Sequence, residues 1–264
     1  MFKRLLACVL LLPTMAMATE LEFGDNQCEV NLNYDVNVSS ERLQVIEQQQ
    51  TLYEFDGTVL RVGEQTITLT DEQRLQLERF QQQLLQGSSD IVALATEAII
   101  MATEVLAEIY TELNIDSNTP EQLMMALQQQ LDTAISADHG SYHLASQSLE
   151  SATTEMEAVI ETHVEKIATE GIGQLFMSMG KAMSDGEGSF EQRMTDFGQS
   201  MEQMGERIEQ RVEQSSTKME AQGQRLCEQW QRLDLQEQRV RDLVPQLQQY
   251  NLVTAEQNKL AFLR

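Results

Sequence analysis

Basic residues are scarce in this chain, which has 18 lysines and arginines against 42 aspartates and glutamates and a formal net charge of −24. Phosphate backbones and anionic lipid head groups are repelled by a field of this sign. The composition therefore argues against nucleic acid and the membrane surface as partners. Aromatic residues make up only 5% of the chain, so the core has to be built mainly from aliphatic residues, methionine and alanine on helices.

Long apolar runs are also rare. The apolar run at residues 5–15 follows the basic pair Lys3-Arg4 and ends in Ala16-Met17-Ala18, which is the pattern of a secretory signal peptide. A run this short, interrupted by Pro13, cannot span a bilayer. We therefore predict cleavage after Ala18 and an exported protein without membrane insertion.

The segment Leu5-Leu6-Ala7-Cys8 offers an alternative, because it superficially matches a lipid-attachment signal. Too few apolar residues precede Cys8 for such a signal, and the apolar run continues past it. Signal-peptide cleavage remains the preferred interpretation.

Cysteine is almost absent once the leader is removed, since only Cys28 and Cys227 remain. Two thiols in an oxidising compartment most simply form one disulfide, which would join the two ends of the folded chain. The alternative is two separate buried thiols. Neither cysteine lies in a Cys-x-x-Cys pair, which argues against a redox role.

Catalytic patterns are missing as well. The sequence has no Gly-x-Ser-x-Gly motif, no phosphate-binding glycine loop and no activated Cys and His arrangement. The many glutamates are spread along the polar faces of predicted helices, where solvated carboxylates are expected. We predict a protein that is not an enzyme and has no cofactor.

Period-two alternation is the main pattern between residues 28 and 69, and it predicts strands. Asp56-Gly57-Thr58 and Gly63-Glu64-Gln65 supply turns between them. A sheet this small has one apolar face that must be covered, and the helices that follow are the obvious cover.

Helical spacing begins after Thr70 and Gln73, which form a capping box. We expect a break or kink near Gly87-Ser88-Ser89-Asp90, and a new helix from Thr119-Pro120 that is interrupted near Asp138 to Ser141. A further helix is predicted from about Tyr142 to Glu170.

A coiled-coil-like seam marks the final helix, although its apolar repeat lapses between Val212 and Met219. The predicted fold class is α+β, mostly α, with a small N-terminal antiparallel β-meander packed on an elongated amphipathic helical bundle. The predicted regions are a signal peptide (1–18), a β-rich region (19–69), a helical region (70–170), a Gly-rich hinge (171–189), the coiled-coil-like helix (190–245) and a tail (246–264), which we expect to be peripheral.

Several short segments resemble the YggN-like family of uncharacterised periplasmic proteins from Gram-negative bacteria. They are Cys28, Val36-Asn37-Val38-Ser39, the segment from Asp56 to Leu69, Gln73-Arg74, Phe197-Gly198 and Cys227. The similarity runs from about Cys28 to Cys227, and we could not match the tail beyond Trp230. The resemblance implies a periplasmic location and a paired terminal cysteine, and it implies no activity.

Two clusters could bind a metal. His139 and His143 have the spacing of two ligands on one helical face, and Asp138 and His163 could complete a Zn(II) site. Met177, Met179 and Met183 could hold Cu(I). The preferred interpretation is exposed histidines without a ligand and methionines that fill core gaps, so we predict no metal site.

The first part of the final helix carries the seam that we predict to bind a partner. Its residues are Phe190, Met194, Phe197, Met201 and Met204. We predict a non-enzymatic interaction protein, either a holdase or a component of an envelope complex, that binds a protein partner or self-associates through this seam. The alternatives are a seam that packs on the protein's own earlier helices, and periplasmic handling of Cu(I) or Zn(II).

Overall fold

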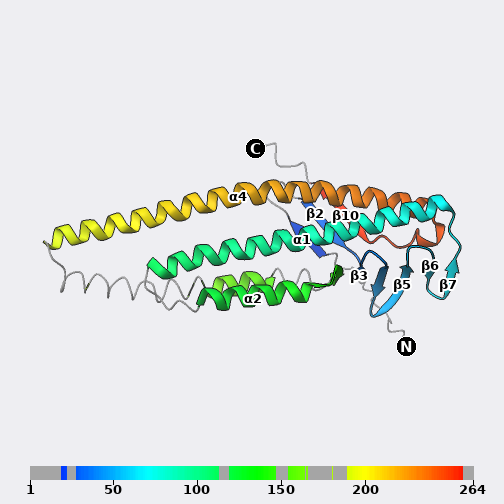
Figure 1. Cartoon of the computed structure of the whole chain (residues 1–264), viewed down its shortest axis with the longest axis horizontal. Helices are drawn as coiled ribbons and strands as arrows, with labels where there is room; N and C mark the ends of the chain where they lie inside the picture. Colours follow the sequence, from blue (N-terminus) through cyan, green and yellow to red (C-terminus); the bar gives the residue numbers. More distant parts are fainter. Residues whose placement is uncertain are drawn as a thin grey trace, which may run out of the picture.

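The computed structural model describes residues 19–22, 28–112, 119–146, 154–163, 165, 180 and 189–257. The molecule is elongated, and its two long helices, α1 (Asp71–Glu112) and α4 (Phe190–Leu243), run side by side along it (Figure 1). Strands gather at one end, beneath the first half of α1. This arrangement confirms the predicted fold class: α+β, mostly α, with antiparallel strands before the helices.

The larger sheet has seven strands in the order β7-β6-β5-β4-β3-β9-β8, and all its pairs are antiparallel. Five strands come from the N-terminal region: β3 (Asp35–Val38), β4 (Leu43–Glu47), β5 (Gln50–Phe55), β6 (Leu60–Val62) and β7 (Gln65–Ile67). They form the predicted meander, with turns at Gly57 and Gly63 as expected. The two other strands, β8 (Ile135–Asp138) and β9 (Ser141–Leu144), come from the middle of the chain and were not predicted.

One face of this sheet is apolar and lies against α1. The side chains of Val36, Val45 and Tyr53 are opposite one another on successive strands and are at most 3% exposed. Leu77, Phe80 and Leu84 of α1 are at most 1% exposed and belong to the same core cluster. The strand and helix periodicities therefore meet in one interface, as an amphipathic helix on a half-buried sheet requires.

Helix α1 begins at the predicted capping box. Gln73 N–H donates to Thr70 Oγ1 over 3.3 Å, and Thr70 N–H donates to Gln73 Oε1 over 2.9 Å. The helix then continues without a break for 42 residues. The expected interruption at residues 87–90 was therefore wrong.

Close packing between α1 and α4 explains why glycine lies inside this helix. A Cβ atom on Gly87 would be 3.3 Å from two indole atoms of Trp230, so the ring of this fully buried residue fills the space of the missing side chain. The neighbouring Ser88 is also fully buried, and its Oγ donates to the carbonyl of Leu84 over 2.8 Å. Gly87 and Ser88 are contact residues rather than helix breakers.

Helix α2 (Thr119–Ala134) begins at the predicted Thr119 and returns along α1, with Leu123, Leu127 and Leu131 buried. The chain then forms the β8–β9 hairpin, whose turn residues His139 and Gly140 have φ angles of 46° and 81°. The expected helix from Tyr142 to Glu170 was therefore wrong at its start, because residues 141–144 form β9. Residues 154–163 are helical.

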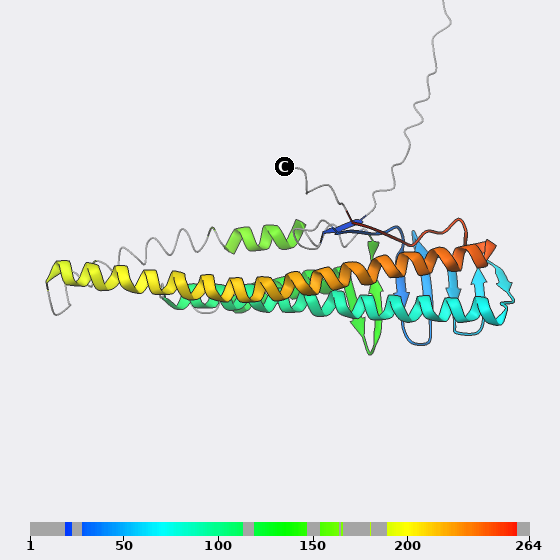
Figure 2. The same ribbon diagram turned by 90° about the horizontal axis from the view of Figure 1, so that it is seen from above.

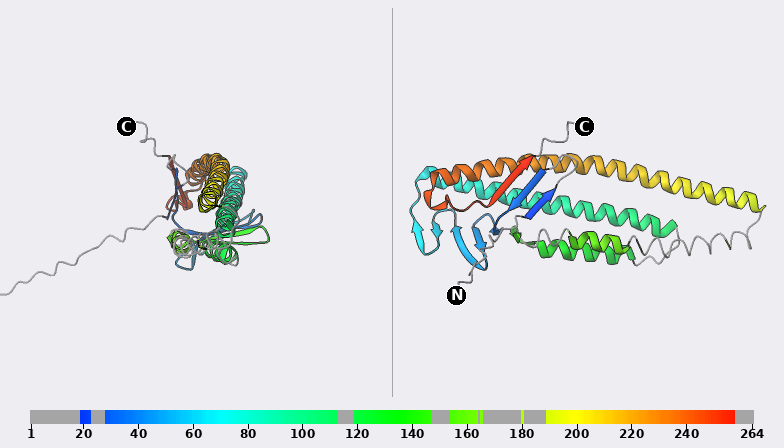
Figure 3. Two further views of the ribbon diagram at one scale, coloured as in Figure 1. Left: turned by 90° about the vertical axis from the view of Figure 1, so that its left-hand side faces the viewer. Right: turned by 180° about the vertical axis from the view of Figure 1, so that it is seen from behind.

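A smaller sheet with the order β1-β2-β10 lies against α4 (Figure 3). It joins β1 (Thr19–Glu22) and β2 (Cys28–Leu32) to β10 (Val253–Gln257), which follows the short 3-10 helix η1 (Pro245–Leu247). Leu247, Leu252 and Val253 are at most 1% exposed. The expectation of a peripheral tail was therefore wrong up to Gln257, because this segment supplies core residues and a strand. Residues 258–264 lie outside the described residues.

Helix α4 is continuous from Phe190 to Leu243. The lapse of the apolar repeat between Val212 and Met219 does not interrupt it, and Figure 2 shows the helix as one rod. Within the described ranges, none of the helices combines the length and the hydropathy that crossing a membrane would require.

Candidate functional site

The first part of α4 extends past the end of α1. Ser189 caps the helix by accepting the N–H of Gln192 over 3.3 Å. Farther along, Arg207 Nε is 3.1 Å from Glu108 Oε1 of the antiparallel α1, which fixes the register of the two helices. This register places Glu112, the last residue of α1, opposite about Gln203. We call residues 190–203 the free end of α4, because within the described residues α1 does not reach them, and Figure 1 shows this end projecting beyond α1.

The ion pairs next to the free end show how α4 binds a helix on this side. Arg211 Nη1 lies 3.8 Å from Glu104 Oε2, and Lys218 pairs with Glu97. Gln222 Nε2 also donates to Glu97 over 3.0 Å. The contact is therefore polar toward the free end and becomes apolar near Trp230.

The predicted seam follows the same side of α4. The backbone positions of Phe190, Met194, Phe197, Met201 and Met204 belong to the helix, and their side chains lie outside the described residues. Their spacing of four and three residues continues to Ile208, which is half-buried, and on to the buried Leu226, Trp230 and Leu233. A Cβ atom on Gly198 would meet no atom of the described residues within 4 Å.

The predicted disulfide remains a prediction. Cys227 is 4% exposed, lies on α4 and is not a free thiol. Cys28 is the first residue of β2, a strand that contacts α4, but its side chain lies outside the described residues. The structure therefore places both cysteines in neighbouring elements without describing their bond.

The helical histidine pair that we considered as an alternative Zn(II) site does not form. His139 lies in the turn of the β8–β9 hairpin, where its Nδ1 contacts Asp138 Oδ1. His143 lies on β9, and its Nδ1 is 2.7 Å from Asn37 Oδ1 on β3. His163 is on the helical segment 154–163, where its Nδ1 is 2.8 Å from the carbonyl of Val159. The four-residue spacing spans a hairpin, so it does not place two imidazoles on one helical face.

Within the described ranges, no group of three or more His, Cys, Asp or Glu residues could hold a metal ion. Met177, Met179 and Met183, which we considered as Cu(I) ligands, lie outside the described residues.

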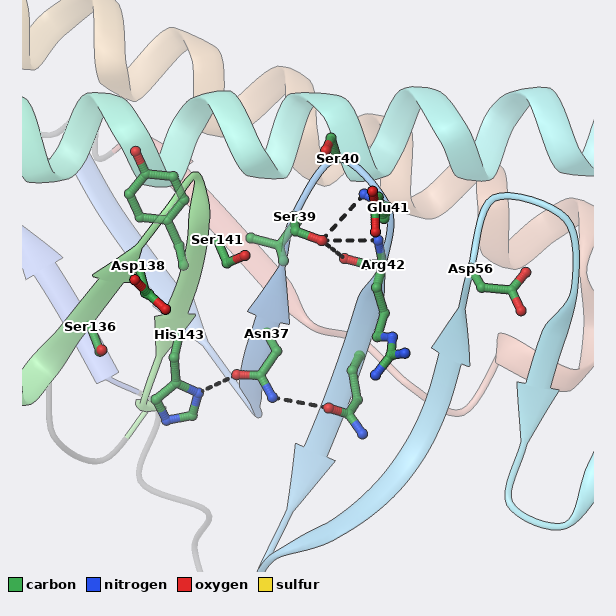
Figure 4. A pocket seen from close by; sticks show the side chains of 13 residues that line it. Asn37, Ser39, Ser40, Glu41, Arg42, Asp56, Ser136, Asp138, Ser141 and His143 are labelled. Atoms are coloured by element: carbon green, nitrogen blue, oxygen red, sulfur yellow. Dashed lines mark hydrogen bonds between the residues drawn. The ribbon is translucent and has the colours of Figure 1, made fainter.

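The polar face of the seven-stranded sheet carries an open groove of about 730 Å³ between the β3–β4 and β8–β9 hairpins (Figure 4). Four residues of its lining are opposite one another on successive strands: Ser136, His143, Asn37 and Gln44. The same row of side chains continues beyond the groove through Glu54, Arg61 and Thr66. Asn37 Nδ2 donates to Gln44 Oε1 over 3.0 Å, and Arg61 Nη1 to Glu54 Oε1 over 3.0 Å. These contacts are those expected of the solvated face of an antiparallel sheet.

Asp56 lies at the rim of this groove and has a structural role. Its Oδ1 accepts the N–H of Val59 and the hydroxyl of Thr58, each over 2.8 Å. The Val59 N–H and the Thr58 hydroxyl lower the pKa of Asp56 from 3.8 to about 2. The carboxylate thus closes the predicted turn between β5 and β6.

A buried carboxyl group on α4 was missed by the sequence reasoning. Glu237 is 2% exposed, and its Oε1 and Oε2 accept the N–H groups of Leu252 and Val253 over 2.5 Å and 2.8 Å. Burial raises the pKa of Glu237 from 4.5 to about 7. The signal was present, because the spacing of Trp230, Leu233 and Val240 places residue 237 on the same buried stripe.

The chain matches, over residues 28–253, the sequence profile of a family described as "Protein of unknown function (DUF2884)". The match extends past Trp230 to Val253, farther than the similarity seen in the sequence alone. Comparison with curated proteins and with solved structures finds no match. Since the profile spans most of the sequence, the chain belongs to the DUF2884 family of proteins of unknown function.

Proposed function

We propose that the chain is a non-enzymatic interaction protein of the periplasm, of the YggN-like group within its family, that binds a helix of another protein along the free end of α4. The observation that carries this proposal is the difference in length between the two long helices. Helix α4 begins at Phe190, whereas the end of α1 lies opposite about Gln203. The seam positions continue across this end with unchanged spacing.

The contact between α1 and α4 is a template for the proposed complex. A partner helix in line with α1 would meet the seam positions in the same way that α1 meets the later part of the stripe. Methionine at Met194, Met201 and Met204 suits such a site, because its flexible side chain adapts to more than one apolar surface. A holdase and a component of an envelope complex would both use a surface of this kind.

The periplasmic location rests on the leader pattern at residues 1–18 and on the two remaining cysteines. We propose that Cys28 and Cys227 form a disulfide, which the burial of Cys227 and the contact of β2 with α4 support. Such a bond would fix the small sheet on α4.

The carboxyl groups with the largest pKa shifts support a non-enzymatic role. Perturbed carboxyls cluster at catalytic sites, but they also occur in structural networks. The turn contacts of Asp56 lower its pKa, and burial of Glu237 in the fold raises the pKa of that carboxyl, so both shifts have a structural cause. Metal handling has less support, because the histidine pair lies on a hairpin rather than on a helix.

Photo-cross-linking in intact cells tests the proposal. A photoreactive amino acid at position 201 should form cross-links to another protein or to a second copy of the chain. The control is position 203, which is exposed and lies about 200° around the helix from position 201. Equal cross-linking from both positions, or cross-links from position 201 only to the chain's own residues, would refute the proposed binding site.

Paired substitutions at Met201 provide a second test. Met201→Leu keeps an apolar side chain and should keep partner binding and any suppression of client aggregation, whereas Met201→Glu should lose both. The fluorescence of Trp230, the only tryptophan and a fully buried one, checks that the core of each variant is intact. Equal binding by both variants would contradict the proposal.

A further inference from the structure

Two hairpins form the walls of the groove on the polar face of the seven-stranded sheet (Figure 4). In the β3–β4 hairpin, Ser39 Oγ accepts the N–H groups of Glu41 and Arg42 over 3.2 Å and 3.1 Å. Gln81 of α1, which is 4% exposed, donates to the carbonyl of Ser39 over 2.8 Å. The β8–β9 hairpin is paired to β3 through β9. Both walls are therefore fixed to the rest of the fold.

A chain of hydrogen bonds connects the floor of the groove across four strands. Asn37 Nδ2 on β3 donates to Gln44 Oε1 on β4 over 3.0 Å, and Gln44 Nε2 donates to Thr51 Oγ1 on β5 over 2.8 Å. On the other side, Asn37 Oδ1 lies 2.7 Å from His143 Nδ1 on β9. Because an amide oxygen can only accept, Nδ1 donates this hydrogen bond, and Nε2 of the neutral ring keeps a lone pair. The floor side chains are therefore held in fixed orientations before any ligand binds.

The floor residues can form further hydrogen bonds with a ligand. The NH₂ groups of Asn37 and Gln44 each have a second hydrogen beyond these contacts, and His143 Nε2 is an acceptor. Ser136, which is opposite His143 on β8, is exposed and adds a hydroxyl group that both donates and accepts. The floor is thus suited to a ligand that carries donors and acceptors together.

The lining of the groove disfavours two classes of ligand. Most of its side chains are polar and Tyr142 is its one aromatic residue, so an apolar ligand would find little contact surface. Three carboxylates and one guanidinium line it: Glu41, Asp56, Asp138 and Arg42. Together with the net charge of −24 on the chain, this excess of carboxylates repels anions. The ligand should therefore be polar and carry no negative charge.

The spacing of the floor residues indicates the shape of the ligand. These residues lie in register on successive strands: Ser136, His143, Asn37 and Gln44. Because neighbouring strands are about 4.8 Å apart, polar groups recur at about this distance along the floor. An extended peptide advances about 3.3 Å per residue and therefore loses this register within a few residues. One unit of an extended sugar chain is nearly as long as the strand spacing, so successive units can meet successive floor residues.

We propose that the groove binds a neutral, extended oligosaccharide that crosses the strands, with one sugar unit over each floor residue. Sugar hydroxyl groups both donate and accept hydrogen bonds, as the floor requires, and a neutral chain is not repelled by the carboxylates of the lining. The site is separate from the partner site that we propose on the free end of α4, because the seven-stranded sheet lies toward the opposite end of the molecule (Figure 1). Hydrogen bonds that replace those to water contribute little each, so we expect weak binding.

Titration of the mature full chain with three tetrasaccharides, followed by NMR of its side-chain amide and imidazole signals, tests the site. Cellotetraose and the tetramer of N-acetylglucosamine are neutral and extended, whereas maltotetraose is neutral but curved. At least one extended probe should shift the signals of Asn37, Gln44 and His143 with a Kd on the order of 1 mM, and maltotetraose should bind roughly tenfold more weakly. If neither extended probe shifted these signals at about ten times that Kd, or if maltotetraose bound equally well, the proposal would be overturned.

Matched alanine variants locate the contacts. Asn37→Ala and His143→Ala should each weaken binding of the extended probe by about fivefold, because each removes hydrogen-bonding groups from the floor. Thr66→Ala, at an exposed position in the same row but beyond the groove, should leave the affinity unchanged. Wild-type affinity in both floor variants would refute the site. If circular dichroism shows that neither floor variant folds, Ser136→Ala on the edge strand β8 decides, because an unchanged affinity in this variant would also refute the site.

Discussion

Replacing two glycines by alanine, one at a time, should change stability in opposite directions. Gly87 lies in α1 against the indole of Trp230, and Gly198 lies in the free end of α4, where a Cβ atom would meet none of the described atoms within 4 Å. Both residues are inside helices, so the intrinsic gain from glycine to alanine is similar, about 1 kcal/mol. The difference between the two variants therefore isolates the contact with Trp230.

The cost at Gly87 follows from the distances. The new Cβ would lie 3.3 Å from Cε2 and Nε1 of Trp230 and 3.4 Å from Cζ2. The indole is fully buried, and because protein interiors are close-packed it cannot move away without displacing its neighbours. Overpacking of this kind costs about 1–3 kcal/mol, so Gly87→Ala should be destabilising by about 1 kcal/mol after the helix gain, whereas Gly198→Ala should be stabilising by about 0.5–1 kcal/mol.

Thermal unfolding followed by circular dichroism and by Trp230 fluorescence measures both changes. The midpoint temperatures of the two variants should differ by roughly 4–8 °C, as a difference of about 2 kcal/mol implies for a protein of this size. If Gly87→Ala were as stabilising as Gly198→Ala, the close packing of α1 on α4 at this position would be refuted.

Three further predictions concern the ends of the fold and the groove. Leu252→Ala should lower the free energy of unfolding by about 2–5 kcal/mol, because the side chain is fully buried. A loss below about 0.5 kcal/mol would show that residues 248–257 add little to the core. Cys227→Ser should lose about 2–5 kcal/mol relative to the oxidised wild type, and addition of reductant should lower the wild type toward the variant; free reaction of both thiols in the untreated protein would contradict the disulfide. The lowered pKa of Asp56 means that its carboxylate stabilises the folded state above pH 4, by less than about 1 kcal/mol because it is partly exposed, and that this stabilisation is lost as the pH falls to about 2. In Asp56→Asn the free energy of unfolding should therefore depend less on pH between 4 and 2. An unchanged pH dependence would argue against the turn contacts.

Local patterns in the sequence predicted the elements whose cause is local. The capping box at Thr70, the turns at Gly57 and Gly63 and the helix start at Thr119 depend on residues within a few positions of one another. The period-two alternation likewise predicted the meander, and the helical spacing predicted the long helices. For the candidate site, spacing alone placed the five seam positions on α4.

Long-range contacts explain what the sequence reasoning missed. Gly87 was interpreted as a helix breaker because the residue that fills its missing side chain, Trp230, is distant in sequence. Strands β9 and β10 are short and become strands through pairing with β3 and β2, which are distant in the sequence. Glu237 was counted among the solvated glutamates, because the backbone N–H groups that bind it come from Leu252 and Val253, beyond the end of its helix.

The pairing of β2 with β10 also sets the order in which the molecule can be completed. Val30 and Ala255 face each other in this ladder although they lie near opposite ends of the chain. During synthesis β2 has no partner on that edge until residues 253–257 have emerged, and closing such distant contacts is slow. We therefore expect that a nascent chain keeps the edge of β2 open, and that closure of this sheet awaits residues 253–257.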